Sequence, residues 1–228
     1  MYLTKLWYLK NLDIFKFVRE VNLEPLMHFT ALSHVEIYQD VYFPEQGSNH
    51  VYFVQEGHVK LSRLDDEGRP AVMDILQPGE IFGKLTLEGE DIPNEFAEAA
   101  DDVTVWVMGR PNSEALLTHV PGLHLHLTKR IDHRLEEYEV KIGDLVFKDA
   151  TRKIISFVAR YGQDFDGSGN RLMTVDKSLS YQDIANLTGT SPETVATAMN
   201  EIQRKELIEC SGQSLVSHDI ACLTNLAR

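Results

Sequence analysis

Four glycines spaced 10 or 11 residues apart punctuate the chain between residues 35 and 107: Gly47, Gly57, Gly68 and Gly79. Between them lie short runs rich in β-branched and aromatic residues, such as HVYFVQEG, HVKLSRL and AVMDIL. The segments DDEG and QPGE add turn signals. Regularly spaced short strands separated by such turns are typical of an antiparallel barrel or sandwich. This region therefore predicts an all-β domain.

The segment before this region has a helical spacing instead. Two groups of apolar residues recur every three positions: Leu12, Phe15 and Val18, then Leu26, Phe29 and Leu32. This period predicts short helices over residues 10–34. The N-terminal stretch contains no small-residue cleavage site, so we do not expect a signal peptide. We also expect no membrane contact, because no apolar run reaches the roughly 18 residues of a membrane span.

After Pro111 a longer helical period predicts a helix over about residues 112–147. An apolar seam runs along it at spacings of 4, 4, 3, 4 and 3: Leu127, Ile131, Leu135, Tyr138, Ile142 and Leu145. The seam fits either a helix packed on its own β-domain or one strand of a parallel dimeric coiled coil. Asp149 is a candidate N-cap for the following helix. We therefore place a boundary at residues 147–149, between a domain of residues 1–147 and one of residues 148–228.

Two short helices with capping signals follow from Leu179 onward. Ser180 and Asp183 predict a capping box at the start of the first helix. Gly189 falls where a left-handed turn residue is needed, and Ser191 precedes a proline that suits the first position of the second helix. The segment LIECSGQSLVS predicts a two-stranded wing. This order is typical of DNA-binding domains, although a generic helical hairpin carries the same local signals.

The charge of the chain is distributed unevenly. Its net charge is −13, yet residues 148–228 carry 9 basic and 10 acidic residues, whereas residues 1–147 carry 13 and 25. The acidic first part argues against simple electrostatic affinity for nucleic acid. Cys210 and Cys222 are the only cysteines, so we expect no disulfide framework and a reducing, cytoplasmic location. A redox role for these two thiols stays open.

The order of these parts resembles the bacterial regulators related to the cyclic-AMP receptor protein and the fumarate–nitrate reduction regulator, the Crp/Fnr family. The resemblance is carried by PGEIFGKL, LTKRIDHRLEEYEVKIGDLVFKDATRKI and SYQDIANLTGTSPETVATAMNEIQRKELI. It implies an α+β fold: a cyclic-nucleotide-binding-like β-roll, a long dimerisation helix and a C-terminal winged helix-turn-helix domain. It also implies a homodimer that places two recognition helices on double-stranded DNA, with RNA polymerase as a further partner.

The pocket that binds cyclic nucleotides in such regulators is degenerate in this chain. The resemblance aligns it with Gly83, Lys84, Leu85, Asn94, Glu95, Tyr138 and Glu139. Lys84 replaces a glutamate that would hold the ribose, and Glu95 lies where the cyclic phosphate would need a cation. We therefore expect no response to cyclic AMP. The identity of any other small-molecule effector stays open.

We expect no metal and no cofactor. Iron–sulfur members of the family need several cysteines near the N-terminus, and this chain has none before Cys210. Three histidines spaced seven residues apart are interrupted by Pro121 and Gly122, so we expect solvated or packing histidines instead of haem ligands. The stretch DFDGSGN matches the start of a calcium loop, but Val175 stands at the position of the closing glutamate, which favours a simple turn.

The second helix of the helix-turn-helix carries no cation before its end. The candidate DNA-binding residues are Ser180, Gln182, Thr190, Ser191, Glu193, Thr194, Thr197, Asn200 and Arg204. Base edges do not require positive charge: Glu193 can accept from cytosine N4, Asn200 can pair with adenine, and Thr194 or Thr197 can meet a thymine methyl. With so few cations we expect weak non-specific binding and a modest salt dependence.

The leading hypothesis is a dimeric, sequence-specific transcription regulator. The alternative is a diverged dimeric effector-sensing or protein-interaction module that no longer reads DNA, and the net charge of −13 favours it. No nucleophile elbow, P-loop, Rossmann fingerprint or zinc-hydrolase motif occurs in the sequence, so we do not expect an enzyme.

Overall fold

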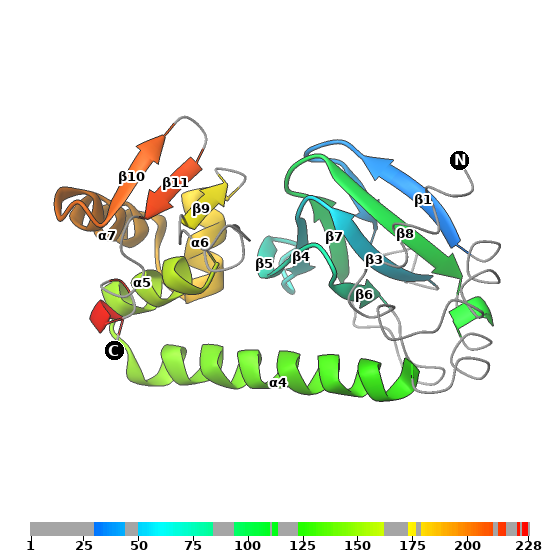
Figure 1. Cartoon of the computed structure of the whole chain (residues 1–228). Helices are drawn as coiled ribbons and strands as arrows, with labels where there is room; N and C mark the ends of the chain where they lie inside the picture. Colours follow the sequence, from blue (N-terminus) through cyan, green and yellow to red (C-terminus); the bar gives the residue numbers. More distant parts are fainter. Residues whose placement is uncertain are drawn as a thin grey trace. The chain divides into compact units, whose positions relative to one another are not determined.

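The computed structural model describes residues 30–43, 50–83, 94–109, 111–113, 123–161, 173–176, 179–211, 214–217, 223 and 225–227. The chain forms two compact units, Met1–Leu135 and Glu136–Arg228, and each is described by itself. Figure 1 shows the strands of the first unit and the helices and small sheet of the second.

The first unit is a sandwich of two four-stranded antiparallel sheets. One sheet has the order β1-β8-β3-β6, formed by β1 (Thr30–Val35), β8 (Val103–Gly109), β3 (His50–Glu56) and β6 (Ile81–Gly83). The other has the order β2-β7-β4-β5, formed by β2 (Asp40–Tyr42), β7 (Glu95–Ala99), β4 (Val59–Leu64) and β5 (Pro70–Leu76). The all-β domain predicted from the glycine spacing is confirmed.

The core of this unit lies between the two sheets. Alternate residues of each strand point inward, because successive side chains of a strand lie on opposite faces. Val54 and Val105 from the first sheet and Val59, Leu76 and Ala97 from the second are fully buried in one cluster. The cluster holds the sheets face to face and positions the turns at their ends.

Strand β1 corrects the helical prediction at its C-terminal end. The apolar spacing predicts helix up to residue 34, but residues 30–35 form a strand. All six pair with β8, from Thr30 opposite Met108 to Val35 opposite Val103. A repeat of three apolar residues is too short to specify a helix, and the cross-strand pairing decides the structure. Residues 10–29, 84–85 and 164–170, on which other predictions fall, lie outside the described residues.

Helix α4 (Leu123–Phe147) contributes to both units and confirms the helical period of the seam. It is followed by α5 (Ala150–Tyr161). Asp149 lies between them, and its Oδ1 accepts a hydrogen bond from the backbone N–H of Arg152 at 2.8 Å. Asp149 is therefore the N-cap of α5, as the sequence predicts. The domain boundary at residues 147–149 stays a prediction, since the two units divide within α4.

The second unit combines helices with a small sheet. Helix α5 packs against α6 (Tyr181–Thr188) and α7 (Pro192–Arg204). Strands β9 (Met173–Asp176), β10 (Ile208–Ser211) and β11 (Ser214–Ser217) form an antiparallel sheet in the order β10-β11-β9. The predicted wing is the β10–β11 hairpin, and β9 extends it by one strand.

None of the helices that the structure describes has the length and apolar character needed to cross a lipid bilayer.

Candidate nucleic-acid interface and effector region

Capping residues set the geometry of the helix-turn-helix. Ser180 Oγ accepts from the backbone N–H of Asp183 at 3.1 Å, and Asp183 Oδ2 accepts from that of Ser180 at 2.9 Å. These reciprocal bonds confirm the capping box. Gly189 ends α6 with φ +61°, and Ser191 Oγ caps α7 by accepting from the backbone N–H of Thr194 at 3.3 Å. The tight turn between the helices is therefore fixed by local bonds.

Helix α7 presents one polar face. Its exposed residues include Glu193, Thr197, Asn200 and Arg204, at spacings of 4, 3 and 4. The buried residues of the helix are Val195, Ala198, Met199 and Ile202. Because the two sets alternate with the helical period, they lie on opposite faces. The predicted base-reading residues thus share the face that is turned away from the core of the unit.

Glu193 is ionised at this surface. Hydrogen bonds from the Ser191 hydroxyl and from its own backbone N–H hold the pKa of Glu193 below its ordinary value. Its place in the first turn of α7 adds a favourable interaction with the helix dipole. An ionised carboxylate only accepts hydrogen bonds, so it suits the N4 amino group of cytosine and repels the acceptor edge of guanine.

The other predicted DNA-binding residues lie beside the two helix starts and along α7. Gln182 is exposed, and its Nε2 donates to Asn186 Oδ1 at 3.1 Å. The Thr190 hydroxyl bonds to that of Thr188 at 2.9 Å. Thr197 Oγ1 donates to the backbone carbonyl four residues earlier at 2.9 Å, so its methyl group is the part left for a thymine.

Two cations at the end of α7 are engaged locally. Lys205 Nζ pairs with Glu201 Oε1 at 2.7 Å, and Arg204 Nε donates to the carbonyl of Asn200 at 3.4 Å. Tyr181 at the start of α6 is exposed and adds a hydroxyl group of the kind that contacts DNA phosphate. Tyr181 is not among the predicted DNA-binding residues, although it directly follows the predicted cap Ser180.

The apolar seam of α4 is largely exposed. Four of its six residues have large exposed fractions: Ile131 (58%), Leu135 (54%), Ile142 (60%) and Leu145 (44%). The other two, Leu127 and Tyr138, are half-buried. A largely exposed apolar line of this length is typical of interaction surfaces.

Helix α4 meets the β-sandwich through arginines. Arg130 Nη2 donates to a carbonyl in the turn between β5 and β6 at 2.7 Å, and Arg134 Nη2 pairs with Asp74 Oδ2 at 3.0 Å. Ile131 and Leu135 belong to the same unit and remain more than half exposed. Within this unit, Ile131 and Leu135 of the seam are therefore not on the face that α4 turns toward the β-sandwich.

Three stacked aromatic rings fill the interior of the sandwich beside Glu95. The ring centroids of Tyr42 and Tyr52 are 5.5 Å apart, those of Tyr52 and Phe82 4.9 Å, and those of Tyr42 and Phe82 6.3 Å. None of the three residues is more than 6% exposed. The Tyr42 hydroxyl donates to Glu95 Oε1 at 2.8 Å. The rings come from both sheets and belong to the buried core between them.

The Tyr42–Glu95 pair is a neutral donor facing a carboxylate. Burial, and then the hydrogen bond and charge of Glu95, raise the pKa of Tyr42 well above its ordinary value, so the phenol keeps its proton. Sequence reasoning identified Glu95 and missed the rings. Each ring belongs to the buried cluster between the sheets, and the aromatic residues of the short apolar runs VYF, VYFV and IFG were the signal that could have found them.

The remaining predicted pocket residues belong to both units. Gly83 ends β6 and Asn94 precedes β7, and both have positive φ, +86° and +64°. Tyr138 and Glu139 lie in the part of α4 that belongs to the second unit, half-buried and exposed respectively. Lys84 and Leu85 lie outside the described residues. The described pocket positions therefore reduce to Gly83, Asn94 and Glu95 in the first unit.

Sequence comparison matches both domains to known families. A model of the cyclic nucleotide-binding domain matches residues 35–119, and a model of the Crp-like helix-turn-helix domain matches residues 152–226. The first match covers most of the β-sandwich, and the second covers α5, the helix-turn-helix and the wing.

Relatives and solved structures agree with these matches. The chain is 26% identical over 180 residues to the global nitrogen regulator of a Nostoc species, covering 78% of this chain and 81% of that protein. It is 24% identical over 188 residues to the CRP-like cAMP-activated global transcriptional regulator of Mycobacterium tuberculosis, covering 82% and 84%. The fold is similar to that of FixK2 from Bradyrhizobium japonicum, with a TM-score of 0.73 and 23% identity over 86% of this chain and 96% of that one.

The two domain matches follow one another in the order of the observed units and together cover most of the chain. The helix-turn-helix has its capped geometry, and its polar face carries the residues predicted to read bases. The protein belongs to the Crp/Fnr family of bacterial transcription regulators.

Proposed function

We propose that the chain acts as a homodimer that binds a two-fold symmetric DNA site through its two α7 helices and regulates transcription there. The observation that carries this proposal is the polar face of α7, with Glu193, Thr197 and Asn200 exposed on a capped helix-turn-helix. In such domains the N-terminal part of the second helix contacts base edges in the major groove. Glu193 and Thr197 lie in that part.

The exposed seam of α4 supports the homodimer. Isolated exposed apolar residues are ordinary, but six residues at spacings of 4 and 3 form one line along a helix. A second copy presents the same line, so two parallel helices would bury each other's seam with two-fold symmetry. The two DNA-binding domains would then meet a site with two related half-sites.

Sequence selectivity is expected to depend on Glu193. Replacing it by Ala removes the acceptor for cytosine N4 and should cost about 1–3 kcal/mol of discrimination at one base pair of each half-site. Binding sites are first selected from a random duplex library, and protection of the best site is then measured by footprinting. Binding to unrelated DNA should stay unchanged.

Glu201→Ala is the matched control, because Glu201 is on the same helix and is paired with Lys205. Glu201→Ala should still protect the selected DNA site in the footprint, whereas Glu193→Ala should not. Equal protection by both variants would remove Glu193 from base reading. A wild-type protein that selects no site would instead favour the diverged module that does not read DNA.

We also propose that the regulator does not respond to cyclic AMP. Glu95 would repel the cyclic phosphate, and the rings of Tyr42, Tyr52 and Phe82 occupy the interior beside it. Calorimetric titration with cyclic AMP up to about 1 mM should give no saturable heat. This range covers dissociation constants down to a binding free energy of about −4 kcal/mol. DNA affinity should be the same with and without the nucleotide.

The Glu95→Gln variant separates the effect of the Glu95 charge from that of the space filled by the three rings. It removes the repulsion and leaves the ring stack in place. We expect it to remain unable to bind cyclic AMP, because the rings still fill the site. Saturable binding by the wild-type protein would contradict the proposal, and binding by the variant alone would show that charge is the only barrier.

The proposal extends to location and partners. A regulator of this type works in the cytoplasm, where its DNA and RNA polymerase are, and the low cysteine content suits that compartment. The regulatory relatives support a role in transcription and not in catalysis.

A further inference from the structure

A buried carboxylate joins α4 to α5 within the second unit. Asp144 lies in the last turn of α4 and is 8% exposed. Lys148 Nζ lies 2.7 Å from its Oδ1, and Ser156 Oγ and Arg160 Nη2 lie 2.6 and 3.0 Å from its Oδ2. Lys148 Nζ also donates to Ser156 Oγ at 3.0 Å. These four side chains, the Asp144 cluster, connect the end of one helix, the connector and the next helix.

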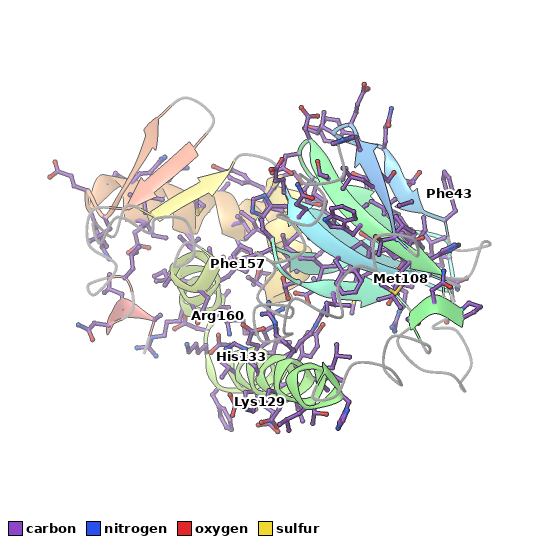
Figure 2. All side chains as sticks on the ribbon, turned by 45° about the vertical axis from the view of Figure 1, so that its right-hand side comes forward. Phe43, Met108, Lys129, His133, Phe157 and Arg160 are labelled. Atoms are coloured by element: carbon purple, nitrogen blue, oxygen red, sulfur yellow. The ribbon has the colours of Figure 1, made fainter. Side chains whose placement is uncertain are left out.

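Helix α5 stands between this cluster and the helix-turn-helix. It folds back beside the last turns of α4 (Figure 1), and Arg160 extends from it toward α4 (Figure 2). Ile154 and Val158 are fully buried, and α5 packs against α6 and α7. Apolar contacts therefore fix α5 to the DNA-binding helices, while the Asp144 cluster fixes it to α4.

The residue after Asp144 touches the helix-turn-helix directly. A Cβ atom added to Gly189 would lie 3.1 Å from Leu145 Cδ2, so the turn between α6 and α7 lies against the end of α4. Leu145 is also the last residue of the apolar seam and is 44% exposed. One side chain thus contacts the helix-turn-helix and belongs to the surface proposed to meet the second chain.

Moving α5 away from α4 would leave the Asp144 carboxylate with Lys148 as its one remaining partner in the cluster. Burial raises the pKa of Asp144, but the hydrogen bonds from Lys148 and Ser156 and the charge of Arg160 together hold it below its ordinary value. The carboxylate is therefore ionised at neutral pH. Separating the helices would break the bonds that Ser156 and Arg160 make to this carboxylate, and breaking a buried charge pair is unfavourable.

We propose that Asp144 is a positioning residue that locks the C-terminal half of α4 and the DNA-binding helices into one rigid body. The direction of α7 is then set by α4 itself, and the connector at residues 148–149 is not a free hinge. The consequence for DNA rests on the proposed dimer: two α7 helices held in this way fit one half-site spacing. The rigid connection is a property of a single chain.

Spin labels test the connection within one chain. With Cys210 and Cys222 replaced by Ser, labels are attached at Val140→Cys on α4 and Thr197→Cys on α7, both exposed positions. The labelled protein is mixed with an excess of unlabelled protein, so that the measured distances are those between the two labels of one chain. Pulsed electron paramagnetic resonance should give one narrow distance distribution, and Asp144→Asn should broaden it about twofold because the joint then has more than one arrangement.

Asp132→Asn is the matched control, since Asp132 is an exposed carboxylate of α4 and its loss changes the charge equally. It should leave the distribution narrow. Equal narrow widths for Asp144→Asn and Asp132→Asn would overturn the proposal. If circular dichroism shows that Asp144→Asn does not fold, Ser156→Ala takes its place, because it removes the 2.6 Å bond and keeps all three charges. An unchanged width there would also overturn it.

Half-site spacing tests the consequence for DNA. The wild-type dimer should bind its selected site about tenfold more tightly than the same half-sites moved apart by one base pair. Asp144→Asn should lose most of this difference, and Asp132→Asn should keep it. A chain that is monomeric or binds no DNA would defeat the proposed function only, because the distance measurement needs neither a dimer nor an operator.

Discussion

Replacing both Ile131 and Ile142 by Asp should convert the protein into monomers and lower its affinity for a selected DNA site by about 100-fold or more. Joining two binding modules raises the overall affinity by at least that factor, and the monomer loses this gain. The two residues are 58% and 60% exposed in a single chain and lie in the apolar seam. In a parallel pair each carboxylate would be buried next to its copy, and an unpaired buried charge costs about 3–5 kcal/mol. Sedimentation velocity at micromolar protein measures the assembly, and fluorescence anisotropy measures the DNA affinity.

Val140→Asp is the control for this experiment. Val140 is 51% exposed on the same helix. It lies two residues from seam positions on either side, which turns it to the opposite face of α4. It should leave the dimer intact. A wild-type chain that sediments as a monomer, or an aspartate variant that stays dimeric, would contradict the seam as the dimer interface.

Features that depend on neighbours in the sequence were predictable. The capping box of Ser180 and Asp183, the left-handed Gly189 and the N-cap Asp149 each involve residues within a few positions of one another. Their side-chain bonds compete with few alternatives, so the residue types alone specify them. The same holds for the strands between the regularly spaced glycines, because turn residues and alternation are local signals.

Features that depend on distant contacts were not predictable. The Tyr42–Glu95 hydrogen bond joins residues 53 positions apart, and the rings beside it belong to three separate strands. The sequence places Glu95 at the pocket only through the family resemblance, and it gives no signal that Tyr42 is its hydrogen-bond partner. Strand β1 shows the same limit, since its pairing with β8 over about 70 positions overrides a local helical spacing.

The Asp144 cluster lies between these cases. Asp144 and Lys148 are one helical turn apart, which is a readable signal for an ion pair on a helix surface. Ser156 and Arg160 reach the same carboxylate only because α5 folds back on α4. The sequence marks only a boundary at residues 147–149. The buried carboxylate that connects α4 to α5 becomes visible only once both helices are placed.

The second large effect is expected at a glycine turn of the β-sandwich. Gly57 has φ +79°, and a Cβ atom there would lie 2.5 Å from the backbone oxygen of Asp102 and 2.6 Å from Asp101 Oδ1. Asp101 cannot move away easily, because its carboxylate binds the backbone N–H and the ring of His58, each at 2.6 Å. Gly57→Ala should therefore lower the free energy of unfolding of this unit by about 3 kcal/mol, from backbone strain and overpacking together.

Gly68→Ala separates the two contributions, since Gly68 has φ +78° and nothing within 4 Å of an added Cβ atom. It carries the same backbone strain without the clash, so it should lower the free energy of unfolding by only about 1 kcal/mol. Urea unfolding followed by the fluorescence of Trp106, fully buried in β8, measures both variants in a Trp7→Phe background. Equal losses would mean that the turn at Asp101 can shift aside. A larger loss for Gly57→Ala would mean that the close approach of the two turns requires glycine at position 57.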